Sequence, residues 1–125
     1  MEKDFDRWNS LKKKIDYSNN KKIFNEKQVW WCKLGINIGS EQNGSDGSFE
    51  RPVLVIKKFS RNILLILPLT NSHKDDRFHY KLSNGSSVLL SQIRLVSIKR
   101  LIRKMYLVTD FEFKNIKNKL INIIK

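Results

Sequence analysis

The spacing of apolar residues divides the chain into a helical beginning, a long middle in which apolar and polar positions alternate, and a helical end. In the first segment, DFDRWNSLKKKID, the apolar residues that recur at helical intervals are Phe5, Trp8, Leu11 and Ile15. This spacing predicts one amphipathic helix. From Val29 onward the period changes to two, which is typical of β-strands. We therefore expect an N-terminal helix in front of a β-rich domain.

Short apolar segments follow one another through the middle of the chain. Those that read as strands are VWWCKL, PVLVIKKF, NILLILPL, RFHYKL and SSVLLSQIRLV. NILLILPL (62–69) is apolar almost throughout, as expected for a central strand that is buried on both faces. Asn84-Gly85 is a dipeptide favoured in tight hairpins. The pattern over 99–108 fits a strand or a helix, and both interpretations stay open here.

The C-terminal end of the chain carries a helix start signal. Thr109 is followed three positions later by Glu112, which is a capping box. The elements together predict a mainly β, α+β fold, namely a compact barrel of about five to seven short strands with this helix packed outside. We interpret residues 1–22 as an N-terminal amphipathic helix with a linker, and residues 23–125 as the domain.

Composition narrows the classes of function. The 125 residues suffice for one domain, and 40% of them are hydrophobic. The formal net charge of +13 favours a partner that is a polyanion, such as nucleic acid, although a solubility role would give the same charge. Cys32 is the only cysteine and no His, Asp or Glu cluster has metal-ligand spacing, so we expect neither a metal nor a cofactor. A membrane-length apolar run and a signal peptide are both missing, which predicts a cytoplasmic protein that does not bind membranes.

Several motifs are weaker than they first look. Gly39 and Gly44 have the separation of a phosphate-binding P-loop, but Ser45 stands where that motif needs lysine. His73 lies in a polar loop from which it can reach phosphate or a base, although such histidines are more often only solvated. Of the adjacent pair Trp30-Trp31, one side chain should fill the core and the other should pack under a helix or at a subunit interface, because neighbouring strand residues face opposite ways.

Arg51 and Thr70 are the two residues whose side chains best suit a phosphate-binding site. Arg51 precedes Pro52 at the start of a strand, which holds its backbone extended. Thr70 ends the buried strand where the chain returns to solvent. Neighbouring strands can bring a guanidinium and a hydroxyl to one rim, where both suit a phosphate. On spacing alone, a salt bridge of Arg51 with Glu50 or another acid, and a turn hydrogen bond for Thr70, are the favoured roles.

Four motifs in order resemble the MazF/PemK toxins: VWWCKLGINIGSEQNG, RPVLVI, LPLTNS and LLSQIRLVSIKRL. The resemblance runs from about Val29 to the C-terminus. It implies an SH3-like barrel, a homodimer, and metal-independent cleavage of single-stranded RNA at short sequences. It also implies a partner antitoxin that neutralises the toxin, with DNA contacted only indirectly through that antitoxin. We expect the antitoxin to be acidic, since it competes with RNA for a basic surface.

The resemblance also assigns roles by position. Arg51 matches the catalytic arginine, Thr70 the catalytic threonine, and Glu41 an acidic residue that some members need. Ser91 stands where many members have Asp, and the segment NGSDGSFE is longer than its counterpart in the family. The further residues expected to bind RNA are Ser40, Gln42, Asn43, Asn71, Ser72, His73, Lys74, Gln92 and Arg94.

The implied chemistry is attack of a ribose 2′-hydroxyl on the adjacent phosphorus, which gives a 2′,3′-cyclic phosphate and a 5′-hydroxyl. Arginine stays protonated near neutral pH, so Glu41 is the candidate general base. Two alternatives remain open at this stage. One is a non-catalytic nucleic-acid-binding module, and the other is a gyrase-targeting toxin of the same fold.

Overall fold

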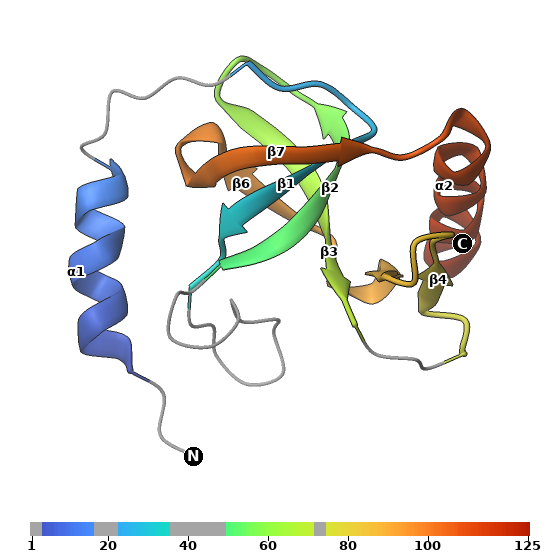
Figure 1. The fold of residues 1–125 in the computed structure, drawn as a ribbon, viewed down its shortest axis with the longest axis horizontal. Coiled ribbons are helices and arrows are strands. Elements are labelled where there is room, and N and C mark those ends of the chain that lie inside the picture. Colours follow the sequence, from blue (N-terminus) through green and yellow to red (C-terminus); the bar gives the residue numbers. More distant parts are fainter. Residues whose placement is uncertain (1–3, 17–22, 36–49, 72–74) are drawn as a thin grey trace.

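The computed structural model describes residues 4–16, 23–35, 50–71 and 75–125. In chain order the elements are α1 (Phe5–Asp16), β1 (Gln28–Lys33), β2 (Glu50–Lys58), β3 (Ile63–Thr70), β4 (His79–Lys81), β5 (Ser87–Leu89), the 3₁₀ turn η1 (Leu90–Gln92), β6 (Arg94–Ser97), the 3₁₀ turn η2 (Ile98–Arg100), β7 (Leu101–Leu107) and α2 (Asp110–Ile124). The predicted mainly β, α+β fold with a helix at each end is confirmed. Figure 1 shows α1 and α2 on opposite sides of the sheet. Residues 99–108, which fitted either a strand or a helix, form mostly β7.

The strands pair antiparallel in the order β4-β5-β3-β2-β1-β7, and β6 adds to β3. β3 pairs with two strands along one edge: its N-terminal half pairs with β6, and its C-terminal end pairs with β5. The path β6-β3-β2-β1-β7 begins and ends with strands that are consecutive in sequence, joined by η2. The predicted barrel is therefore a curved sheet that strand pairing does not close within the described residues.

Two hydrophobic clusters occupy the two faces of this sheet. The inner cluster, enclosed by the curved strands, consists of Phe24, Trp30, Cys32, Leu34, Val53, Val55, Leu64, Ile66, Val96, Ile98 and Leu101. β2 contributes Val53 and Val55 to it and turns Leu54 and Ile56 to the other face. β3 is likewise buried on both faces, as its continuous apolar sequence predicted.

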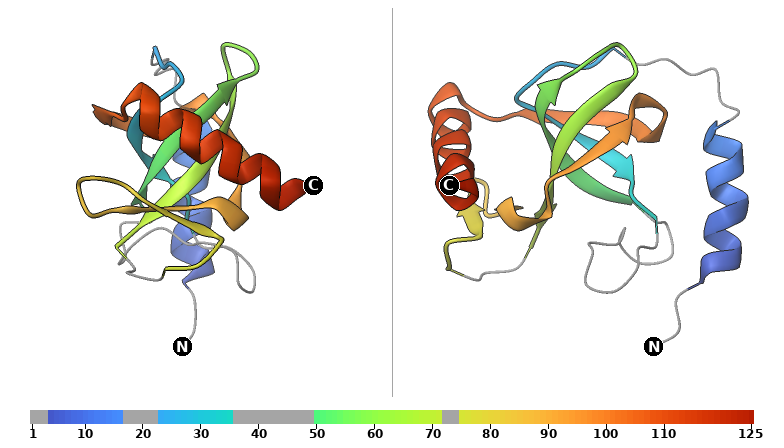
Figure 2. Two further views of the ribbon diagram at one scale, coloured as in Figure 1. Left: turned by 90° about the vertical axis from the view of Figure 1, so that its right-hand side faces the viewer. Right: turned by 180° about the vertical axis from the view of Figure 1, so that it is seen from behind.

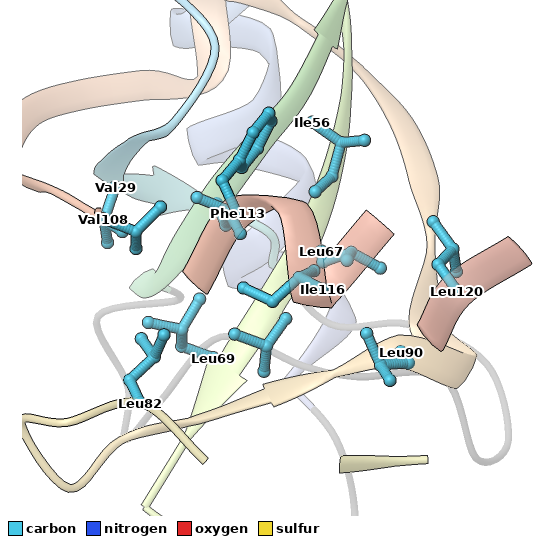
Figure 3. Close-up of a cluster of buried hydrophobic side chains, with 12 residues drawn as sticks. Val29, Ile56, Leu67, Leu69, Leu82, Leu90, Val108, Phe113, Ile116 and Leu120 are labelled. Atoms are coloured by element: carbon cyan, nitrogen blue, oxygen red, sulfur yellow. The ribbon is translucent and has the colours of Figure 1, made fainter. Parts of the chain in front are cut away.

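The helix cluster lies between α2 and the opposite face of the sheet. Figure 3 shows Phe113 and Ile116 of α2 against β-strand residues that include Leu67 and Leu69. The capping box holds the start of this helix: the Glu112 amide donates to Thr109 Oγ1 across 3.1 Å. Helix spacing thus buries one stripe of α2 on the sheet and leaves its other side exposed.

Trp8 anchors α1 on the sheet. Trp8 is 6% exposed, whereas Phe5 is 47% exposed. The indole lies against Gly35, where φ is +75° and a Cβ would fall only 2.0 Å from Trp8 Cε2. Gly35 is therefore required both by its backbone angle and by the closeness of the ring. The right-hand view of Figure 2 shows α1 (blue) standing beside the sheet, away from α2 (red).

Candidate functional site

Arg51 and Thr70 lie at neighbouring ends of β2 and β3. The ladder pairs Val53 with Pro68, and its register, continued by two residues, sets Arg51 opposite Thr70. Arg51 Nη1 donates to the carbonyl oxygen of Leu69 across 3.1 Å. Both residues are half-buried, so each is held by the sheet and still reached by solvent. The expected convergence of these two strand ends is therefore present.

Strand alternation sets the direction of these side chains. Arg51 is two residues before Val53, so it continues the inner face of β2 at its rim. Thr70 has the same relation to Ile66 on β3, four residues away. Arg94 is the register partner of Ile66 and shares this face on β6. We call Arg51, Thr70 and Arg94 the rim site.

Glu50, one acid considered as a salt-bridge partner of Arg51, forms ion pairs with Lys33 and Arg103. Alternation turns Glu50 to the opposite face of β2, where it pairs with Lys33 across 3.4 Å. Arg103 lies 3.9 Å from the same carboxylate. Arg103 also sits 5.2 Å from the ring centroid of Trp31, which is half-buried on that outer face. Trp30 is buried in the inner cluster, as predicted for one member of the tryptophan pair.

Cys32 is buried on the inner face, close enough to Arg94 and Arg100 to be influenced by their charges. It is the register partner of both Arg51 on β2 and Leu101 on β7. Burial raises the pKa of the Cys32 thiol to about 12, while the positive charges of Arg100 and Arg94 act in the opposite direction. The thiol is therefore neutral and unsuited to nucleophilic attack at ordinary pH.

Arg100 is a residue near the site that the sequence did not single out. Its Nη1 donates to the Lys33 carbonyl oxygen across 3.3 Å, and its guanidinium lies 5.6 Å from the Trp8 ring centroid. Burial lowers the pKa of Arg100, and the neighbouring charge of Arg94 lowers it further. Arg100 was missed because it lies in η2, where the strand periodicity is interrupted.

The other predicted site residues are only partly placed. Gln92 lies in η1 and is half-buried, and Asn71 is exposed just after β3. Outside the described residues lie Ser40, Glu41, Gln42, Asn43, Ser72, His73 and Lys74. The other histidine, His79, lies 2.6 Å through Nδ1 from Asp76 Oδ1, and its side chain is 10% exposed.

The described part of the chain lacks two kinds of feature. No group of three or more His, Cys, Asp or Glu residues there is arranged to hold a metal ion. None of the helices there is long and apolar enough to cross a membrane.

Sequence comparison decides the family. The profile of the PemK-like, MazF-like toxins of type II toxin–antitoxin systems matches residues 25–124. The chain belongs to this family. No curated protein sequence matches this PemK/MazF-like chain. The profile begins at the loop before β1, and α1 lies outside it.

Solved structures share the fold of this PemK/MazF-like chain. MazF from Deinococcus radiodurans (Form-I) has a TM-score of 0.67 at 20% identity, over 82% of this chain and 97% of that one. An endoribonuclease from a Mycobacterial species, in complex with its cognate antitoxin, has a TM-score of 0.65 at 15% identity, over 82% and 95%. MazE-MazF (Form-II) from D. radiodurans gives 0.64 at 15% identity, over 82% and 96%. At these identities the likeness establishes the fold.

Proposed function

We propose that this chain is a sequence-specific endoribonuclease toxin that cleaves single-stranded RNA without a metal ion. The observation that carries the proposal is the convergence of Arg51 and Thr70 at the rim of the inner face. Membership of the PemK/MazF-like toxin family supports the toxin class, and neighbours of the same fold are described as endoribonucleases.

The proposed reaction is an intramolecular transesterification of RNA. The 2′-oxygen attacks the adjacent phosphorus, its proton passes to a base, and the 5′-oxygen leaves and takes up a proton. The products are a 2′,3′-cyclic phosphate and a 5′-hydroxyl. Arg51 and Thr70 stabilise the negative charge that develops on the phosphoryl oxygens, and one such preorganised donor contributes roughly 3–4 kcal/mol. We assign the base to Glu41, since the Arg51 guanidinium keeps its proton near neutral pH.

Binding of the substrate rests on charge. A net charge of +13 supplies a sequence-independent attraction to phosphates. The partners we propose are single-stranded RNA, a second copy of the chain in a homodimer, and an acidic antitoxin segment that covers the rim site and so competes with RNA. DNA is contacted only indirectly through the antitoxin. The site of action is the cytoplasm, and residues 1–22 are an accessory segment of the domain at 23–125.

One experiment tests this proposal directly. Purified protein is incubated with a mixed pool of RNA in EDTA, and the new ends are mapped, with the Arg51→Ala protein as the matched control. We expect cuts at one short sequence, with 5′-hydroxyl ends, and no cleavage of DNA of the same sequences, because DNA lacks the 2′-hydroxyl. Binding without cleavage would indicate the non-catalytic module. Absence of both, with inhibition of gyrase, would indicate the gyrase-targeting class.

A further inference from the structure

The docking of α1 places Trp8 in contact with Gly35 and Arg100. α1 lies against η2, and its buried anchor Trp8 touches Gly35, two residues after β1. The Arg100 guanidinium rests near the same indole, 5.6 Å from the ring centroid. The cation–π contact with the indole and the hydrogen bond to the Lys33 carbonyl together restrain the planar guanidinium.

The position of Arg100 relates it to the rim site. It is near enough to both Cys32 and Arg94 for their charges to influence one another. Cys32 in turn lies directly opposite Arg51 in the β1–β2 ladder. Arg94 and Arg100 are therefore close to the buried Cys32 thiol, and Arg51 lies opposite the same residue in the neighbouring strand at the rim of the inner face.

Such a gathering of cations suits a ligand with more than one negative charge. Half-buried like charges repel each other, and phosphates bound between them remove that repulsion. A strand of RNA presents consecutive phosphates, so a cation beside the cleavage position can hold the neighbouring phosphate. Arg51 with Thr70 suits the scissile phosphate, which leaves Arg100 and Arg94 for an adjacent one.

We propose that Arg100 binds an RNA phosphate next to the scissile one, and that Trp8 of α1 is the positioning residue that orients Arg100 for this contact. This inference rests on the proposed function, since it assumes an RNA ligand at the rim site. It gives α1, which lies outside the segment matched by the family profile, a direct effect on the affinity for RNA.

The test measures binding without cleavage. The probe is a mixed-sequence single-stranded RNA oligonucleotide with 2′-O-methyl groups, which remove the nucleophile. Affinity is measured by fluorescence anisotropy over a range of salt concentrations for wild type, Trp8→Ala, Arg100→Gln and the double variant. Lys57→Gln is the matched control, because it removes one exposed charge at the far end of β2 from Arg51.

We expect Trp8→Ala and Arg100→Gln each to weaken binding about 3- to 30-fold, the range for a lost cation contact. Each should also reduce the slope of log K against log salt by about 0.7, as expected for one fewer phosphate contact on a single strand. The double variant should be no worse than the worse single variant. Trp8→Phe should restore most of the affinity, and Lys57→Gln should leave the slope unchanged. With cleavable RNA, KM should rise while kcat stays near the wild-type value.

Unchanged binding, tighter binding after Trp8→Ala, or additive losses in the double variant would each overturn the inference. If Trp8→Ala does not fold, the Nε–Hε resonance of Arg100 in wild-type protein decides by NMR. A shift on addition of the probe supports the contact, and no shift contradicts it. Because the probe cannot be cut, these results remain valid even if the wild-type protein fails to cleave RNA, which would refute only the proposed function.

Discussion

The Arg51 guanidinium donates a hydrogen bond to the carbonyl oxygen of Leu69, 3.1 Å away, and so ties the cation of β2 to the residue just before Thr70. The bond spans 18 positions of sequence but only one step between neighbouring strands. It fixes one edge of the guanidinium fork against the sheet. The Arg51 guanidinium is thereby held beside the strand end that carries Thr70 before any ligand arrives.

Removing the hydroxyl of Thr70 should slow cleavage and leave the fold intact. Thr70→Val keeps the shape and the β-propensity of the side chain but loses a donor to the phosphate. We expect the cleavage rate under saturating enzyme to fall by about 10²-fold, with an unchanged melting temperature. Thr70→Ser is the control, since it keeps a hydroxyl and should stay within about tenfold of wild type. Equal activity of the valine and serine variants would remove Thr70 from the chemistry.

Most helices and strands could be predicted from the sequence because each depends on residues that are close together in the chain. The capping box at Thr109 marked the start of α2, and the apolar run ending at Thr70 marked a strand buried on both faces. Two apolar runs placed Arg51 at the start of one strand and Thr70 at the end of the next, and their closeness was expected from this.

Arg100 shows where sequence patterns stop being informative. It lies in a 3₁₀ turn without strand periodicity, and its partners come from residues 67 and 92 positions earlier, Lys33 and Trp8. No local rule connects such distant positions. The strand path is another feature that local patterns did not give: within the described residues its end strands β6 and β7 are joined by η2 and do not pair with each other.

The N-terminal cap of α2 should contribute to stability and not to chemistry. In Thr109→Ala the Glu112 amide loses its acceptor, which should lower the free energy of unfolding by about 1 kcal/mol, within a range of about 0.5–2 kcal/mol. Thr109→Ser keeps the acceptor and serves as the control. Urea denaturation followed by circular dichroism measures the change. An alanine variant as stable as wild type would show that the cap contributes nothing, and a loss of cleavage at full stability would contradict the separation of α2 from the site.

The Cys32 thiol should react only when the protein unfolds. Burial raises its pKa from 9.0 to about 12, so the native protein holds almost no thiolate at pH 8. Labelling with a disulfide reagent at pH 8 should be at least about 10²-fold slower in buffer than in urea, and it should follow the unfolding curve. Rapid labelling of native protein would show that the inner face around Cys32 opens readily.

The same thiol makes a pH-dependent contribution to stability. Its folded pKa lies above its unfolded value, so the folded protein binds the proton more tightly. That contribution is complete below about pH 9 and is lost as the pH rises towards 12. Wild type should therefore lose unfolding free energy more steeply over this interval than Cys32→Ala does. Parallel curves for the two proteins would contradict the raised pKa.

The central claim is that Arg51 and Thr70 act together on one transition state, and single-turnover cleavage by folded Arg51→Ala tests it most directly. With the RNA sequence found by mapping and protein in excess, the rate constant should fall by about 10²-fold or more. Binding should weaken only modestly, because most of the 25 lysine and arginine residues remain. Arg51→Lys should restore little, since an ammonium lacks the planar fork. Arg51→Ala combined with Thr70→Val should be scarcely slower than the slower single variant. Near-normal cleavage by folded Arg51→Ala protein would contradict the claim and leave the arginine with a structural role.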